Sequence, residues 1–93
     1  MSNFNNFDID DLRKEIDKID SSLLSLFENR MEVVLKISEY KIKNDLEILN
    51  GVREEEIIKK NLDLVKNKDF LIEVEEFFRS VMEISRDFQK KNK

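Results

Sequence analysis

The stretch from Asp8 to Lys43 carries apolar side chains in the alternating three- and four-residue spacing that places them on one face of a helix. Neither Pro nor Gly interrupts it, and a helix of this length would be about 54 Å long. A compact domain of this size has a radius of gyration of only about 12 Å. The pattern therefore predicts a helix that overhangs any compact monomer and needs a second chain to cover its apolar face. The positions on that face are Ile9, Leu12, Ile16, Ile19, Leu23, Leu26, Val33, Ile37 and Tyr40.

Two further helices are expected after the long one. Asn50 is a suitable N-cap for a short second helix, which should end near residues 66–68. Asp69 can cap a third helix of medium length, whose apolar stripe again has the helical spacing. That stripe comprises Phe70, Val74, Phe77, Val81, Ile84 and Phe88. Residues 1–7 are polar apart from Met1 and two Phe, and they predict a loose N-terminal arm.

Composition agrees with an all-α fold. The chain has one Gly, no Pro and 41% charged residues. It therefore has few of the Gly and Pro residues that form the tight turns between β-strands. Ninety-three residues make one domain near the size at which oligomerisation commonly stabilises a small core. We therefore predict an all-α, three-helix chain, with one long, one short and one medium helix, that forms an intertwined helical homodimer as a single domain over residues 1–93.

The residue types that are missing exclude several kinds of function. Without Cys or His, disulfides, thiolate nucleophiles, imidazole bases and most zinc sites are ruled out. The net charge is −4 with Lys and Arg spread among Glu and Asp, which argues against nucleic acid as a partner. No secretory signal and no apolar run of membrane-spanning length is found. We expect a soluble cytoplasmic protein without a membrane partner.

Arg30 breaks the apolar stripe of the long helix. A charge in such a position costs several kcal/mol unless it is paired. Its partner is either a carboxylate of another helix, which would make a structural ion pair, or an anionic ligand. Lys41 lies eleven residues later, within about 20° of the same face and about 16 Å along the helix. Arg13 lies too far from Lys41 to meet it within one chain, but an antiparallel partner could bring the two together.

Other polar residues extend this set. Arg53 and Glu54 begin the second helix, where pairing with neighbouring charges is the ordinary explanation. Ser85 and Gln89 lie one turn apart beside the apolar stripe of the third helix. The whole set contains strong anion binders and no evident nucleophile or metal cage.

The ordered set of residues resembles a known family. The run Leu12-Arg13-Lys14-Glu15-Ile16-Asp17-Lys18-Ile19-Asp20, then Leu23-Leu24, Arg30-Met31, Lys41 and Val52-Arg53-Glu54, is similar to the all-helical (AroQ-class) chorismate mutases. The resemblance covers essentially residues 9–91. It implies a dimer of three-helix chains that rearranges chorismate, a dicarboxylate, to prephenate without a cofactor, a step of phenylalanine and tyrosine biosynthesis.

The resemblance also implies a role for each candidate residue. Arg30, with Arg13 from the other subunit, would hold the substrate carboxylates. Lys41 and Gln89 would donate hydrogen bonds to the ether oxygen, Lys41 also contacting a carboxylate, so that Lys41, Gln89 and Arg30 are the expected catalytic residues. Glu54 would bind the ring hydroxyl, and Arg53 and Ser85 would complete the polar lining. The family often has Asp where this chain has Asn50, which would affect the contact on the hydroxyl side.

Two alternative functions compete with this hypothesis. An isochorismate-pyruvate lyase shares the fold and most of the cations but eliminates pyruvate, and the Arg53-Glu54 pair favours the mutase. A non-catalytic dimerisation or regulatory module would use the same cations only in ion pairs. Turnover of chorismate separates a catalyst from a module, and product analysis separates mutase from lyase.

Overall fold

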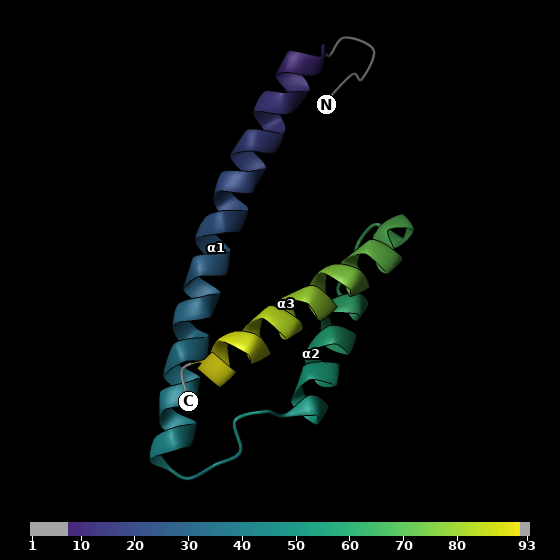
Figure 1. Ribbon diagram of the computed structural model, residues 1–93. Coiled ribbons are helices and arrows are strands. Elements are labelled where there is room, and N and C mark those ends of the chain that lie inside the picture. Colours follow the sequence, from purple (N-terminus) through teal and green to yellow (C-terminus); the bar gives the residue numbers. More distant parts are fainter. Residues whose placement is uncertain (1–7, 92–93) are drawn as a thin grey trace. The chain divides into compact units, whose positions relative to one another are not determined.

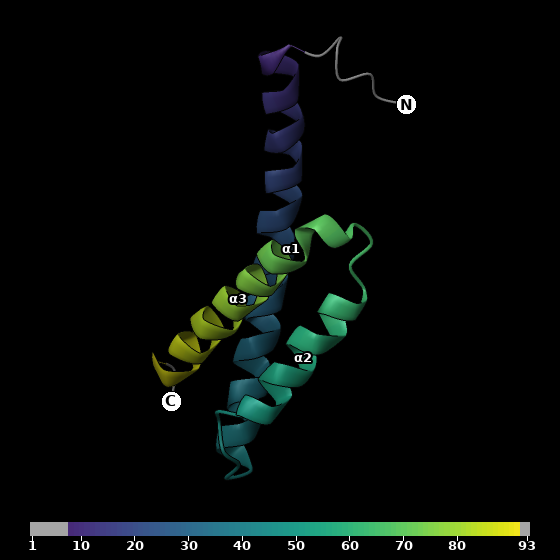
Figure 2. The same cartoon turned by 90° about the vertical axis from the view of Figure 1, so that its right-hand side faces the viewer.

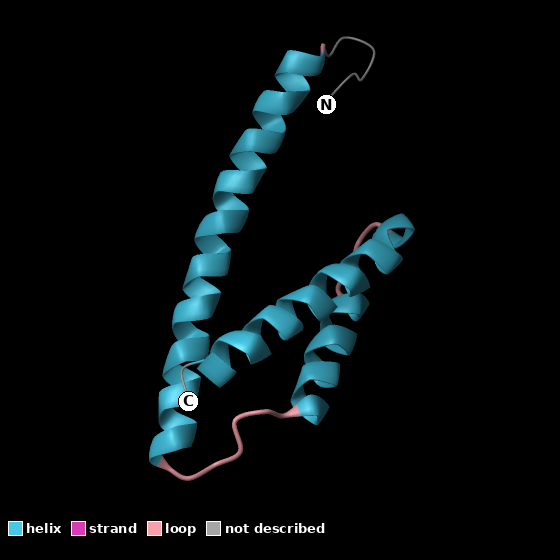
Figure 3. Cartoon of the chain, in the orientation of Figure 1, coloured by secondary structure: helices cyan, strands magenta, loops and turns pink. Residues whose placement is uncertain are grey.

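The computed structural model describes residues 8–91, and all of its regular structure is helical (Figures 1 and 3). Helix α1 spans Ile9–Lys43, α2 spans Gly51–Asp63, a 3₁₀ turn η2 spans Lys68–Phe70, and α3 spans Leu71–Lys91. No strand occurs in the described part of the chain. The prediction of an all-α chain with a long, a short and a medium helix is confirmed, whereas the predicted N-terminal arm, residues 1–7, lies outside the described residues.

The chain divides into two compact units, residues 1–32 and 33–93, and α1 passes from the first into the second. In the first unit, the Asp8 side chain accepts a hydrogen bond from the backbone N–H of Asp11 at 2.8 Å. Asp10 and Asp11 lie in the first turn, where carboxylates stabilise the positive end of the helix dipole. The helix therefore starts where its acidic residues predict.

The apolar stripe of α1 is largely uncovered in the single chain. In the first unit, Ile19 and Leu26 expose 60% and 66% of their surface. Ile9, Ile16, Leu23 and Leu24 are also exposed there. Contiguous exposed apolar surface of this kind marks an interaction site or a liability to aggregate. The first unit thus presents the surface that the sequence predicted a second chain would cover.

The end of α1 is closed by two backbone hydrogen bonds. The N–H of Leu46 donates to the carbonyl of Lys41 at 2.8 Å, and the N–H of Asp45 donates to that of Ile42 at 3.2 Å. This is the pattern of a Schellman motif, in which one residue takes the left-handed conformation. Here that residue is Asp45, with φ of 54°. A side chain is disfavoured in this conformation, although Asp tolerates it better than most residues do.

We expect Asp45→Gly to stabilise the protein by about 0.5 to 1 kcal/mol. Glycine adopts positive φ without a clash, and this gain exceeds the added freedom of the unfolded chain. Asn44→Gly adds similar backbone freedom without relieving a positive φ, which is confined to Asp45 among the non-glycine residues described, but it also loses the hydrogen bond from Asn44 Nδ2 to the Tyr40 carbonyl at 2.8 Å. Urea unfolding of both variants at one protein concentration measures the effect. A midpoint for Asp45→Gly at or below that of the wild type would contradict the prediction.

Helices α2 and α3 form a hairpin within the second unit (Figures 1 and 2). Its core contains Ile58 of α2 with Val81 and Met82 of α3, each with at most 5% of its surface exposed. Ile57, Leu62 and Phe78 pack around them. Burying an apolar side chain of this size stabilises a fold by about 1.5 to 3 kcal/mol. The core accounts for the mutual placement of these two helices.

The junction between α2 and α3 differs from the expected one. Asn50 caps α2 as predicted, but the helix stops at Asp63, about three residues early, and Leu64 closes it. The third helix is preceded by the 3₁₀ turn, whose cap is Asn67. The Asn67 side chain accepts from the N–H of Asp69 at 3.0 Å, so that Asp69 lies inside the turn. The expected capping role of Asp69 was therefore wrong by two residues.

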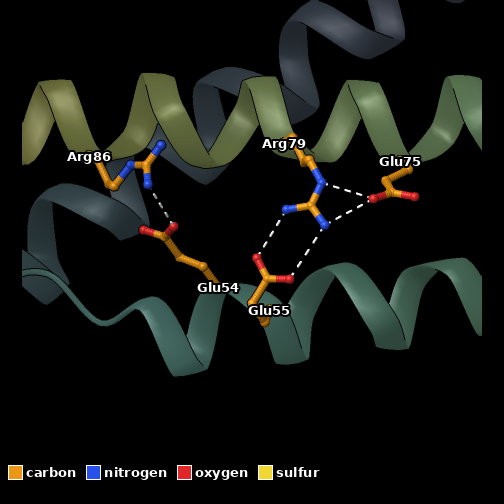
Figure 4. A network of polar contacts seen from close by, with 5 residues as sticks. All are labelled: Glu54, Glu55, Glu75, Arg79 and Arg86. Atoms are coloured by element: carbon orange, nitrogen blue, oxygen red, sulfur yellow. Dashed lines mark hydrogen bonds and ion pairs between the residues drawn. The ribbon is translucent and has the colours of Figure 1, made fainter.

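An exposed ion-pair network also joins the two helices (Figure 4). Arg79 of α3 contacts Glu55 of α2 at 3.0 Å and Glu75 of its own helix at 2.9 Å. The hydrogen bonds from Arg79, followed by its charge, lower the pKa of Glu55. The pKa of Arg79 is raised, mainly by its hydrogen bond with Glu55. All three side chains remain substantially exposed, so this network contributes little to stability compared with the core.

Candidate active site

The N-terminus of α2 contains three of the predicted site residues. Asn50 is the N-cap, and its Oδ1 accepts from the backbone N–H of Arg53 at 3.0 Å. The exposed Arg53 side chain pairs with Glu56 on its own helix at 3.6 Å. Asn50 thus has a structural task here, and Arg53 makes the ordinary local pair considered in the sequence analysis. The capping bond uses Oδ1 of Asn50 and not its Nδ2 donors.

Glu54 is held differently from its neighbours. It extends from α2 towards α3, where Nη1 of Arg86 donates a hydrogen bond to its Oε1 at 3.2 Å (Figure 4). Only 18% of the Glu54 side chain is exposed, against 41% of the Arg86 side chain. The helix hairpin therefore fixes one predicted site residue, Glu54, against the C-terminal half of α3.

Ser85 and Gln89 lie in that same half of α3, one turn apart. Ser85 is buried, and its hydroxyl donates to the carbonyl of Val81 at 2.8 Å. Gln89 is half-buried, and its amide has both donor and acceptor atoms. Because both residues lie within α3 and are four positions apart, they share one face of that helix.

Lys41 lies in the last turn of α1, within the second unit. Its Nζ donates to the carbonyl of Ile48 at 2.9 Å, which ties the connection after α1 back to the helix. This bond uses one of the three N–H donors of the ammonium group. The side chain borders an open hollow of about 470 Å³. Its lining consists of Lys41, Ile42, Asp45, Leu46, Glu47, Ile48 and Leu49.

The two remaining predicted cations, Arg13 and Arg30, belong to the first unit. Arg30 is half-buried, and burial lowers the pKa of its guanidinium, as expected for a cation withdrawn from water. Arginine nevertheless stays charged at neutral pH. Arg13 is exposed and lies 3.8 Å from Asp10 on the preceding turn. In the single chain this exposed pair leaves the Arg13 side chain at the surface.

Arg86 was not identified from the sequence. Arg79 and Arg86 lie seven residues apart on α3, and both meet the acidic run that begins α2, Glu54 and Glu55. Two arginines at this spacing opposite adjacent glutamates are the signal that could have revealed the pairing.

A sequence comparison decides the family of this chain. The profile of the family described as chorismate mutase type II matches residues 12–90. The chain belongs to the chorismate mutase type II family. The resemblance inferred from the ordered motifs is thereby confirmed, and the chain is placed in a family of isomerases. Comparisons with curated proteins and with solved structures found no match.

Two further features of the chorismate mutase type II chain concern membranes and metal ions. None of the helices within residues 8–91 is both long and apolar enough to cross a membrane. In the same residues, acidic side chains do not gather in a group of three or more that could hold a metal ion.

Proposed function

We propose that this chorismate mutase type II protein converts chorismate to prephenate in the cytoplasm, as a step of phenylalanine and tyrosine biosynthesis and without a cofactor. The observation that carries the proposal is the family match over residues 12–90. The residue set supports it, because cations, an amide and a carboxylate suit a dicarboxylate that reacts without a base or nucleophile.

The proposed reaction is an intramolecular Claisen rearrangement. The C–O bond between the ring and the enolpyruvyl group breaks while a C–C bond forms between the same two parts, and no proton enters or leaves. Catalysis then has two sources. The protein binds the extended side chain in its folded, reactive form, and it places donors where negative charge grows on the ether oxygen.

In this proposal Arg30, together with Arg13 of the second chain, binds the two carboxylates. Arginine suits this task because its planar fork matches a carboxylate and its charge persists when it is partly buried. The lowered pKa of Arg30 reflects the desolvation that an anionic ligand would offset. Glu54 accepts a hydrogen bond from the ring hydroxyl, with Asn50, Arg53 and Ser85 lining the polar side of the site.

Lys41 and Gln89 are the proposed donors to the ether oxygen. Lys41 is half-buried beside the hollow at the end of α1, and its bond to the Ile48 carbonyl orients the ammonium group while leaving two donors. A fixed donor needs no reorganisation as charge develops, which is the condition for effective electrostatic catalysis.

The proposed active form is a homodimer in which the stripe on α1 of one chain covers that of another. This would bury the exposed apolar residues of the first unit, such as Ile19 and Leu26. It would also bring Arg13, a surface residue in the single chain, into the site of its partner. A closed two-fold dimer creates two equivalent sites of this kind.

Incubation of the purified protein with chorismate tests the proposal. We expect the ultraviolet absorbance of chorismate to fall and prephenate to accumulate. Isochorismate is offered in parallel, and release of pyruvate from it alone would identify a lyase instead. If neither substrate reacted, the non-catalytic module would be the better description.

Gln89 gives the proposed mechanism a distinctive pH dependence. Its amide donates without titrating, so we expect turnover to persist between about pH 6 and 8 and to be indifferent to chelators. In Gln89→Glu the donor must be a protonated carboxyl, and activity should return only in acid, towards the reference Glu pKa of about 4.3. Initial rates across this range measure both profiles. Equal profiles for the two proteins would exclude Gln89 as the donor.

A further inference from the structure

The pair formed by Glu54 and Arg86 is better shielded than the other ion pairs around it. Its carboxylate is 18% exposed, whereas the carboxylates paired with Arg13, Arg53 and Arg79 expose between 43% and 79% of their side chains. Shielding strengthens the interaction and restricts the side chains that make it. The pair therefore holds Glu54 in one arrangement more firmly than a surface pair would.

Arg86 also occupies a distinctive place along α3. It follows Ser85 directly and precedes Gln89 by three residues, so it shares their part of the helix. Arg79, two turns earlier, makes the corresponding contact with Glu55 in an exposed position (Figure 4). One helix thus carries two arginines that both contact α2, and only one of them contacts a proposed site residue.

We propose that Arg86 is a positioning residue for substrate binding, which holds Oε1 of Glu54 so that the carboxylate is aimed to accept a hydrogen bond from the substrate's ring hydroxyl. This inference rests on the proposed function. The contact engages Oε1, and a carboxylate has a second oxygen and further lone pairs with which to accept. Without Arg86, the Glu54 side chain would have to be ordered when substrate binds, which weakens binding.

The kinetic signature of this role differs from that of a catalytic donor. The ring hydroxyl is not a reacting group, so its hydrogen bond to Glu54 is equally strong before and during the rearrangement. Loss of such uniform binding raises KM and leaves kcat unchanged. Loss of a donor to the ether oxygen, in contrast, lowers kcat.

Steady-state kinetics of Arg86→Met with chorismate test the inference. We expect KM to rise by up to about tenfold, which is the cost of ordering one side chain when substrate binds, while kcat stays within about twofold. Arg86→Lys keeps the charge but not the planar fork, and we expect a smaller rise of about threefold. Arg79→Met is the matched control, since it removes the other arginine between the same helices and should leave KM unchanged. Circular dichroism verifies that each variant is folded.

A double-mutant cycle shows whether Arg86 acts through Glu54. In a Glu54→Ala background, Arg86→Met should raise KM no further. The same rise in both backgrounds would mean that Arg86 contacts substrate itself, and a KM equal to that of Arg79→Met would mean that the pair is only structural. Either result overturns the inference. Should Arg86→Met fail to fold, Arg86→Lys decides, because an unchanged KM there also overturns it.

Failure of this inference is distinguishable from failure of the proposed function. Wild-type turnover with an unchanged KM in Arg86→Met would refute the role of Arg86 alone. Absence of wild-type turnover would refute the proposed function, and the role of Arg86 with it.

Discussion

Lys41→Ala should lower kcat for chorismate by a factor of about 10² to 10³ while the protein stays folded. In the proposed mechanism the substitution removes a donor from the oxygen on which negative charge grows, and loss of one well-placed donor of this kind costs about 3 to 4 kcal/mol of barrier. Stability should fall far less. The structural bond lost is the one to the Ile48 carbonyl, and a single hydrogen bond contributes about 0.5 to 1.5 kcal/mol.

Lys43→Ala is the matched control for this experiment. Lys43 lies in the same last turn of α1 as Lys41, so both lysines interact favourably with the helix dipole. Lys43 is exposed, however, and does not line the hollow that Lys41 borders. Comparison of kcat and of the melting temperature for both variants separates catalysis from stability. If Lys41→Ala unfolded the protein, or slowed turnover no more than Lys43→Ala, Lys41 would be a structural residue.

Leu23→Lys should dissociate the proposed dimer and lower its stability by about 3 kcal/mol or more per chain. Leu23 lies on the stripe of α1 and is 47% exposed in the single chain. In the proposed dimer the substitution both removes an apolar contact and requires burial of a charge. It would do so on both chains at once, because the two are related by symmetry.

Ser21→Lys introduces the same charge on the opposite side of α1, about 200° around the helix from Leu23. We expect this control to keep the oligomeric state of the wild type. Light scattering gives that state, and the unfolding midpoint of the wild type should rise with protein concentration, as mass action requires. A folded, active wild-type monomer would rule out the dimer, and Leu23→Lys would then behave like Ser21→Lys.

The features of the fold that the sequence predicts well are those with a periodic or chemical signature. The apolar spacing and the absence of Pro and Gly predict α1 to within one residue, and the side-chain chemistry of Asn50 predicts the start of α2. The end of α2 is misplaced because Val65 continues the apolar pattern and no Gly interrupts it. The backbone N–H of Leu64 instead closes the helix by donating to the carbonyls of Asn61 and Leu62. No residue type in the sequence predicts these hydrogen bonds.

The candidate site shows a similar division. The family resemblance implies a site role for eight residues, chosen by type and spacing, and the family itself is confirmed over residues 12–90. The contacts that these residues make within the chain were not predicted. Glu54 meets Arg86 because two helices pack in one particular register, and Lys41 meets the Ile48 carbonyl because the following segment folds back. Both contacts depend on tertiary geometry, for which a single sequence contains no direct signal.

The two arginine contacts between α2 and α3 should respond differently to the medium. Arg79 lowers the pKa of Glu55, so this exposed pair favours the folded state above the ordinary pKa of a glutamate, and its contribution disappears as pH falls through the lowered value. Added salt screens it in the same way. The more shielded Glu54–Arg86 pair is screened less. In a saline medium the Arg79 contacts therefore weaken before the Glu54–Arg86 contact does, while the apolar core still holds the two helices together.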